Sequence, residues 1–364
     1  MIAYLGAFSP QGKQLAERVK KLSLSLQYGN VHSRYGGRCV CGQMIWRTRG
    51  EQPAGAWLQE AFAGGFPVIL VGALGIAVRM IAPYLKSKVI DSPVLVLDES
   101  GQFVIPVLSG HLGGANELAG MLAKGLGATA VITTATDVHS LFAVDVFARK
   151  NGLYICNPQN IRHVSGKLLH GEPVTMAVDP VCMTQEQAAG LRTPEEVHLV
   201  PWNPPQENEA PDIVITPELP QAGEQQNTLY LSPKMVVLGM GCRKNKSYTE
   251  IEQFVYNLLQ REKIKTDQIF VLASVEAKEN EAGLQMLAQK LRIPFVVFSP
   301  EELKNVPGEF SSSGFVAQTI GVDNVCERAA AAAADGGKLI LQKQAADGMT
   351  AALAIREQIT LSFD

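Results

Sequence analysis

Residues 105–122 read IPVLSGHLGGANELAGML, and the fold of the surrounding chain follows from this stretch. The apolar run from Phe103 to Leu108 is typical of a buried strand. It gives way at Ser109 and Gly110 to leucines with helical spacing at positions 118, 122 and 126. The pattern therefore predicts a strand, a tight turn and then a helix.

The turn and the start of this helix carry a cluster of polar side chains. His111 lies in the turn, and Asn116 and Glu117 follow Gly113 and Gly114 by one helical turn. Residues three and four apart share a helix face, so the glycines leave Glu117 without side chains to screen it. Glycine inside a helix costs about 1 kcal/mol relative to alanine. A ligand that approaches the backbone would explain this cost, but a frayed helix start with a satisfied histidine explains the pattern equally well.

Polar or glycine-rich clusters follow three predicted strands of the first third of the chain. They are Gly72-x-x-Gly75 after residues 68–71, Ser109-Gly110-His111, and the segment from Thr133 to Asp137, which includes Thr134. Ligands of open α/β sheets bind at the carboxyl ends of the strands. The agreement of these three clusters is better evidence for a ligand site at strand ends than any one of them alone.

The strands at residues 94–97 and 103–108 are joined by a loop of hairpin length, so we expect them to be antiparallel. This geometry places Asp98 at the opposite edge of the sheet from Ser109. Asp91, which precedes the incoming strand, falls on the same edge as Ser109. Asp91 is therefore the better candidate for a site residue.

The composition limits the class of protein. A chain of 364 residues predicts two or three domains, and 46% apolar residues suffice for sizeable cores. The net charge of −3 gives no broad basic surface, which argues against nucleic acid as a partner. The first residues lack the pattern of a signal peptide, and the longest apolar run, residues 67–78, falls short of the ~20 residues of a membrane span. We expect a cytoplasmic protein that does not bind membranes.

The six cysteines, at positions 39, 41, 156, 182, 242 and 326, include no Cys-x-x-Cys pair. Only His32 lies near Cys39 and Cys41, and a zinc site needs two close pairs or a pair with spaced histidines. We therefore predict reduced thiols and no metal site.

The element pattern predicts an α/β protein with two three-layer units joined by a smaller middle region. Residues 1–137 form the first unit, with a flavodoxin-like or Rossmann-like mixed sheet, and residues 231–364 form the second. The middle region, 138–230, has helices at 142–149 and 158–169 and a strand at 174–178, and then a proline-rich connection from Pro201 to Pro220. Residues 29–55 are expected to be a solvated loop, with a mobile flap as the alternative.

In the second unit, strands are expected at 235–238, 269–272, 295–298 and 339–341, and helices at 283–291, 315–321 and 325–334. Ser247 and Glu250 form a capping box that predicts the start of a further helix. Gly239-x-Gly241 follows the first of these strands, but Lys244 stands where a dinucleotide site has its third glycine. Backbone amides in such a turn still bind anions. We expect a carboxylate-binding turn at Gly239, Gly241 and Arg243, with a solvated basic loop as an equal alternative.

Together these motifs resemble one family over nearly the whole chain: the CbiG proteins of cobalamin biosynthesis, cobalt-precorrin 5A hydrolases of the anaerobic corrin pathway. The last third also resembles a stand-alone domain of the aerobic pathway. One departure is Val275-Glu-Ala-Lys278, where the family often has Ile-Asp-Leu-Lys, and it puts a role for Glu276 in doubt. The motifs that carry the resemblance are residues 72–75 with Arg79, 81–83, 108–118, 133–137 with 142–147, 239–243, 272–275 with Lys278 and Glu281, and 321–325 with Glu327.

The resemblance implies a hydrolysis in which water opens the δ-lactone of cobalt-precorrin 5A and acetaldehyde leaves. His111 would move protons near neutrality because an unperturbed imidazole has a pKa of ~6.5. Backbone amides of Gly113 and Gly114 would stabilise the oxyanion. Asn116 would orient the lactone, and Glu117 would hold His111 or act as a second base.

The substrate implied is a small cobalt corrinoid with many carboxylates, which Arg79 and Arg243 would bind. Its cobalt arrives with the substrate, so no cofactor or resident metal is expected. A homo-oligomer and transient contacts with other enzymes of the pathway are further expectations. The alternatives are a non-catalytic carrier of a corrinoid intermediate and an unrelated nucleotide-binding enzyme.

Overall fold

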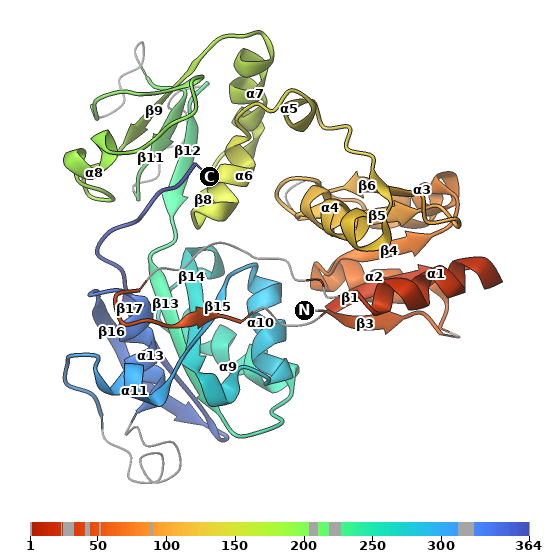
Figure 1. The fold of residues 1–364 in the computed structure, drawn as a ribbon. Coiled ribbons are helices and arrows are strands. Elements are labelled where there is room, and N and C mark those ends of the chain that lie inside the picture. Colours follow the sequence, from red (N-terminus) through yellow and green to blue (C-terminus); the bar gives the residue numbers. More distant parts are fainter. Residues whose placement is uncertain are drawn as a thin grey trace. The chain divides into compact units, whose positions relative to one another are not determined.

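The computed structural model describes residues 2–22, 24, 33–40, 44–50, 52–87, 90–203, 210–217, 227–311 and 324–363. The chain divides into two compact units, one made of Met1–Leu26 with Cys41–Val146 and the other of Gln27–Val40 with Phe147–Asp364. Three β-sheets carry helices on their faces, so the fold is α/β, as the sequence predicts (Figure 1). No helix in the described part of the chain is long and apolar enough to cross a membrane.

The first unit is built on a six-stranded sheet in the order β3-β1-β4-β5-β6-β7. Helices α1 and α4 share one apolar core with this sheet. Trp57 of α2 packs on Tyr4 of β1, with 5.4 Å between the ring centroids. Adjacent strands are parallel except for β5 and β6, which form the expected antiparallel hairpin. The elements are β1 (Ile2–Ala7), β3 (Ile45–Thr48), β4 (Val68–Val71), β5 (Val94–Leu97), β6 (Phe103–Leu108), β7 (Thr129–Ala130), α1 (Pro10–Lys20), α2 (Ala54–Gly64), α3 (Leu74–Ile81), a 3-10 turn (Ala82–Tyr84), α4 (Ala115–Leu126) and α5 (Ala135–Val138).

The hairpin places the three strand ends at two different edges of the sheet. Strand β4 is parallel to β5, and β6 is antiparallel to β5, so β4 and β6 have their carboxyl ends at opposite edges of the sheet. Strand β7 is parallel to β6, and the segments after these two strands therefore share an edge. The clusters at 109–111 and 133–137 therefore lie at one edge of the sheet, and Gly72 and Gly75 lie at the other.

The middle part of the second unit is a five-stranded sheet in the order β10-β9-β11-β12-β8. The proline-rich stretch was expected to be irregular, and this is wrong for Ile213–Ile215, which forms the buried central strand β11. Three apolar residues between prolines are too short a run to show a strand by periodicity. The elements are α6 (Val144–Lys150), β8 (Leu153–Ile155), a 3-10 turn (Pro158–Asn160), α7 (Ile161–Leu169), β9 (Val174–Val178), α8 (Gln185–Ala189), β10 (Val197–Leu199), β11 (Ile213–Ile215) and β12 (Leu229–Pro233).

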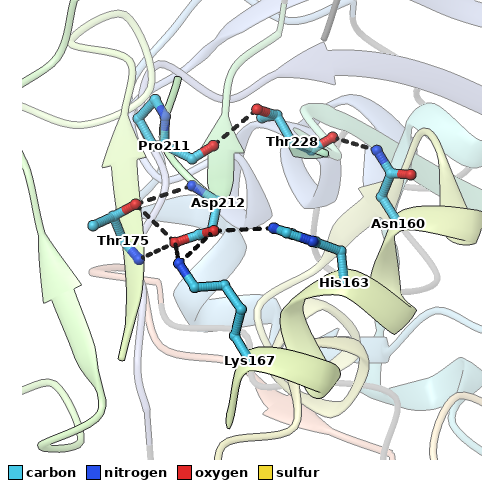
Figure 2. Close-up of polar contacts among 7 residues, drawn as sticks. All are labelled: Asn160, His163, Lys167, Thr175, Pro211, Asp212 and Thr228. Atoms are coloured by element: carbon cyan, nitrogen blue, oxygen red, sulfur yellow. Dashed lines mark hydrogen bonds and ion pairs between the residues drawn. The ribbon is translucent and has the colours of Figure 1, made fainter. Parts of the chain in front are cut away.

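A buried aspartate ties helix α7 to this sheet (Figure 2). The Asp212 carboxylate accepts the backbone N–H of Thr175 at 2.8 Å and its hydroxyl at 3.0 Å, and Lys167 Nζ lies 2.9 Å from both carboxylate oxygens. His163 Nε2 lies 3.3 Å away. Burial raises the pKa of Asp212, but Lys167 and Thr175 outweigh it and the net pKa is lowered. His163 therefore adds a second contact from α7 to Asp212.

The second sheet of this unit has six strands in the order β16-β17-β13-β14-β15-β2. Helices α9 and α10 share one apolar core with it and α13 shares another, which gives the predicted three layers. The predicted helix at 315–321 lies outside the described residues. The elements are β2 (Arg38–Cys39), β13 (Val236–Cys242), α9 (Tyr248–Arg261), 3-10 turns (Thr266–Gln268 and Glu276–Lys278), β14 (Ile269–Val275), α10 (Ala282–Leu291), β15 (Phe295–Phe298), α11 (Pro300–Lys304), α13 (Val325–Ala333), β16 (Lys338–Ala346) and β17 (Met349–Ile355).

The segment at residues 33–40, expected to be a solvated loop, belongs to this last sheet. Strand β2 pairs antiparallel with β15, and the backbone N–H of Gly37 donates to Glu302 Oε1 at 3.0 Å. Arg34 forms an ion pair with Asp335, with Nε 3.2 Å from Oδ1. The expectation failed because the pairing joins residues more than 250 positions apart, which no local pattern reveals.

Candidate functional site

The imidazole of His111 lies between two carboxylates of the first unit. Its Nε2 is 2.7 Å from Asp137 Oδ2, and its Nδ1 is 3.1 Å from Asp145 Oδ1. The side chains of His111 and Asp145 are only 13% and 11% exposed, whereas that of Asp137 is 37% exposed. Solvent therefore reaches this cluster mainly through Asp137.

These contacts change the protonation of the histidine. Burial alone lowers the pKa of His111, but the hydrogen bond and charge of Asp145, followed by those of Asp137, raise it to about 9. The ring is thus an imidazolium at neutral pH, with both N–H groups directed at carboxylates. We expected His111 to have an unperturbed pKa and to move protons near neutrality. This is wrong, because the two aspartates stabilise the charged ring and raise its pKa.

Asn116 completes the cluster at the start of α4. Its Nδ2 donates to Asp137 Oδ2 at 2.7 Å and to Thr134 Oγ1 at 3.0 Å. A Cβ on Gly110 would lie 2.6 Å from Asn116 Oδ1, so glycine at this position gives the amide its room. The structure thus brings together four predicted site residues, His111, Asn116, Thr134 and Asp137.

The glycine turn is closed by its own backbone. The N–H groups of Gly114, Ala115 and Asn116 donate to the carbonyls of His111, Ser109 and Gly110, at 3.0, 3.1 and 3.0 Å. Gly114 has φ of 82°, a left-handed conformation that favours glycine, and α4 begins only after it. The Gly114 amide is therefore occupied, which corrects its expected role as an oxyanion donor.

Gly113 is required by packing, since a Cβ there would lie 2.5 Å from Ser109 Cβ. Ser109 Oγ donates to the carbonyl of Asp91 at 2.8 Å, so Asp91 lies beside the turn on the expected edge. Its carboxylate accepts the backbone N–H of Lys86 at 2.9 Å. Asp91 thus supports the turn from a buried position.

Glu117 is exposed on α4. We expected it to hold His111, but both ring nitrogens contact Asp137 and Asp145. Asp145 was not singled out from the sequence, although it lies in the segment 142–147 that carries part of the family resemblance. A carboxylate at the start of a helix and 34 residues from its partner gives no local signal.

The remaining candidates of the first unit lie elsewhere. Gly72 and Gly75 follow β4, at the edge opposite to the end of β6, and Arg79 is exposed on α3. Among the described residues, nothing outside the glycine's own helix and chain neighbours lies within 4 Å of a Cβ placed on Gly75, so close packing does not require its glycine. These residues are not part of the His111 cluster.

The predicted anion-binding turn of the second unit is a strand. Gly239 and Gly241 lie within β13 and pair with β17. A Cβ on Gly239 would lie 2.0 Å from the Cys326 carbonyl oxygen, and one on Gly241 would lie 2.8 Å from Thr350 Oγ1. These two glycines therefore serve close packing, which corrects their expected role. Arg243 follows the strand and is exposed, with its N–H donating to the Gly348 carbonyl at 2.9 Å.

Within the described residues, no group of three or more His, Cys, Asp or Glu side chains is arranged to hold a metal ion. The described cysteines, at positions 39, 156, 182, 242 and 326, are free thiols. What the first unit offers is instead a charged hydrogen-bonded cluster. It lies where two parallel strands end, a usual position for ligand sites in such sheets.

The fold and this cluster define a modular α/β protein with an aspartate–imidazolium–aspartate site in its first unit. The chain belongs to the CbiG family of cobalamin biosynthesis proteins. Family models match it in three consecutive parts: Cobalamin synthesis G N-terminal over residues 56–137, Cobalamin biosynthesis central region over 142–233, and Cobalamin synthesis G C-terminus over 236–354.

Two curated relatives cover most of the chain. A protein of Salmonella typhimurium named cobalt-precorrin-5A hydrolase is 34% identical over 280 residues, which are 75% of this chain and 77% of that protein. A protein of Priestia megaterium with the same name is 32% identical over 305 residues, 82% of this chain and 80% of that one. Among solved structures, a putative cobalamin biosynthesis protein G homolog from Sulfolobus solfataricus matches with a TM-score of 0.36 and 21% identity, covering 98% of this chain and 97% of its own.

Proposed function

We propose that this protein is a cobalt-precorrin-5A hydrolase, which opens the δ-lactone of its substrate with water and releases acetaldehyde to give cobalt-precorrin 5B. The observation that carries this proposal is the 34% and 32% identity to two relatives of that name over most of their length. In this proposal the cobalt belongs to the substrate and the chain needs no cofactor. The enzyme would work in the cytoplasm.

The cluster around His111 is our candidate for the catalytic site. Because the pKa of His111 is raised to about 9, the ring serves as a fixed positive charge at neutral pH. Asp137 Oδ2 accepts from both His111 and Asn116. Asp137 Oδ1 accepts no hydrogen bond from any described residue, and the side chain is the most exposed of the three charged groups. We therefore assign the role of base to Asp137.

The reaction moves protons in both the hydrolysis and the C–C cleavage, and one carboxylate can act as base and then as acid in each. Asp137 Oδ1 accepts a proton from the water that attacks the lactone carbonyl. When the ester C–O bond breaks, the alkoxide takes this proton and becomes a hydroxyl, while the carbonyl carbon becomes a carboxylic acid. Asp137 then removes the hydroxyl proton, the neighbouring C–C bond breaks, and acetaldehyde leaves. The macrocycle takes up the electron pair of that bond together with the proton held by Asp137, so the Asp137 carboxylate is regenerated.

The assignment is tested by replacing the proposed base and its neighbours. We expect Asp137→Asn to reduce turnover by about 100-fold or more, because the amide cannot accept the proton. Glu117→Gln, a change of charge at an exposed position of α4 next to Asn116, should alter turnover by less than about threefold. The assay follows acetaldehyde release under anaerobic conditions, and binding of the pigment is checked by its absorbance. Full turnover in Asp137→Asn with bound pigment would remove Asp137 from the mechanism.

A further inference from the structure

The second unit contains a cavity of about 410 Å³ that has no part in the proposed chemistry. Its walls come from several parts of this unit: Arg34, three residues of the middle part (150, 151 and 187), Phe270 of β14, residues 334–335 after α13, and the C-terminal segment after β17. The C-terminal segment is fixed to the middle part, because the N–H groups of Ile359 and Ser362 donate to the Cys182 carbonyl at 2.9 Å and to Asn151 Oδ1 at 2.7 Å. The volume falls in the range of small-molecule sites, which often lie where parts of a protein join.

Arg356 is the central feature of this cavity. Its guanidinium lies over the ring of the buried Phe270, 3.9 Å from the ring centroid. Burial lowers the pKa of Arg356 to about 10, which Asp335 partly opposes. Stacking on one face orients the planar group and leaves its N–H edges for an oxyanion.

No carboxylate of the described residues forms an ion pair with Arg356. Asp335 is taken by Arg34, whose Nε lies 3.2 Å from Oδ1 and whose backbone N–H donates to the same oxygen at 2.7 Å. The Lys150 side chain adds positive charge to the wall, and Glu357 is the other acidic residue there. A partly buried guanidinium that no carboxylate contacts directly is costly unless an anion binds it.

We propose that this cavity binds a small oxyanion, a carboxylate or a phosphate group, through the edge of the stacked Arg356 guanidinium. The site lies in the second unit and is independent of the cluster around His111. Arg356 supplies two parallel N–H donors, the geometry that carboxylate and phosphate share. Gln358 and Thr360 line the same wall and offer further donors.

The test uses the full chain and two probes, inorganic phosphate and succinate, titrated by isothermal calorimetry at low ionic strength. We expect at least one probe to bind the wild-type protein, and the preferred probe distinguishes a phosphate site from a carboxylate site. Arg356→Lys keeps the charge but loses the planar fork, and it should weaken binding tenfold or more. Arg261→Ala removes an exposed arginine of the same unit that does not line the cavity, and it should bind as wild type.

Phe270→Leu provides a second variant that leaves the arginine in place. It should weaken binding severalfold because the guanidinium loses its stacking partner. Circular dichroism checks that each variant is folded. No binding of either probe up to about 10 mM, or equal binding by the wild type and Arg356→Lys, would overturn the proposal.

Discussion

Asp145→Asn tests the electrostatics of the His111 cluster, because it removes one charge from the imidazolium while the side chain keeps its shape. The rise in the pKa of His111 from 6.5 to about 9 corresponds to roughly 3 kcal/mol in favour of the charged ring. Asp145 contributes more of this than Asp137. Its loss should lower the pKa of His111 to about 7.5 or below.

The direct assay is an NMR titration of the histidine ring signals, in which His111→Gln identifies the signal among the six histidines. Asp98→Asn is the matched control, since Asp98 lies in the turn at the other edge of the sheet. Because the folded pKa is raised, the stabilisation is complete below about pH 6.5 and is lost as the pH rises through about 9. Asp145→Asn should therefore cost about 2 kcal/mol of unfolding free energy at pH 6 and less at pH 9.5. A wild-type pKa below 7, or one that Asp145→Asn leaves unchanged, would refute the reasoning.

Three further outcomes follow. Asp212→Asn leaves Lys167 without its carboxylate and should lower the free energy of unfolding in urea by about 3 kcal/mol at pH 7. This difference should shrink as the pH falls below about 4, because the pKa of Asp212 is lowered in the folded protein. An unchanged unfolding free energy at pH 7 would contradict this prediction. Gly239→Ala should lower the free energy of unfolding by about 3 kcal/mol, because the added methyl group meets the backbone of α13. Gly166→Ala is the control: the space around Gly166 is open, and the substitution should raise the free energy of unfolding by about 0.5 kcal/mol in the same assay. The pH profile of turnover should show no titration of His111 below about pH 8 and a fall as its proton is lost near pH 9; a step near pH 6.5 that disappears in His111→Gln would contradict this account.

Local patterns predict those parts of the fold that local interactions determine. The strand, turn and helix around His111 follow from apolar spacing, and the β5–β6 hairpin follows from the length of its loop. The capping box at Ser247 and Glu250 likewise marks the start of α9, where both side chains bond to the backbone. In each case the residues that determine the element are within a few positions of one another.

The features that the sequence did not reveal depend on distant partners. Strand β2 exists because β15 offers an edge, and β11 is a strand because β9 and β12 lie on either side. The partners of His111 are 26 and 34 residues away, and one of them, Asp145, was not recognised. Gly239 and Gly241 resemble a ligand-binding turn, but they are glycines because Gly239 packs against the backbone of α13 and Gly241 against the Thr350 side chain. A glycine pair alone does not distinguish a close ligand from a close helix.

The most direct measurement of the central claim is an anaerobic incubation of the wild-type protein with cobalt-precorrin 5A in water enriched in heavy oxygen. Mass spectrometry of the pigment and trapping of the aldehyde then follow both products. The hydrolase account predicts release of acetaldehyde, and a pigment that carries one heavy oxygen atom in its new carboxylate. A pigment that binds with unchanged mass would contradict it and favour a carrier, and acetaldehyde without labelled pigment would exclude water as the group that opens the lactone.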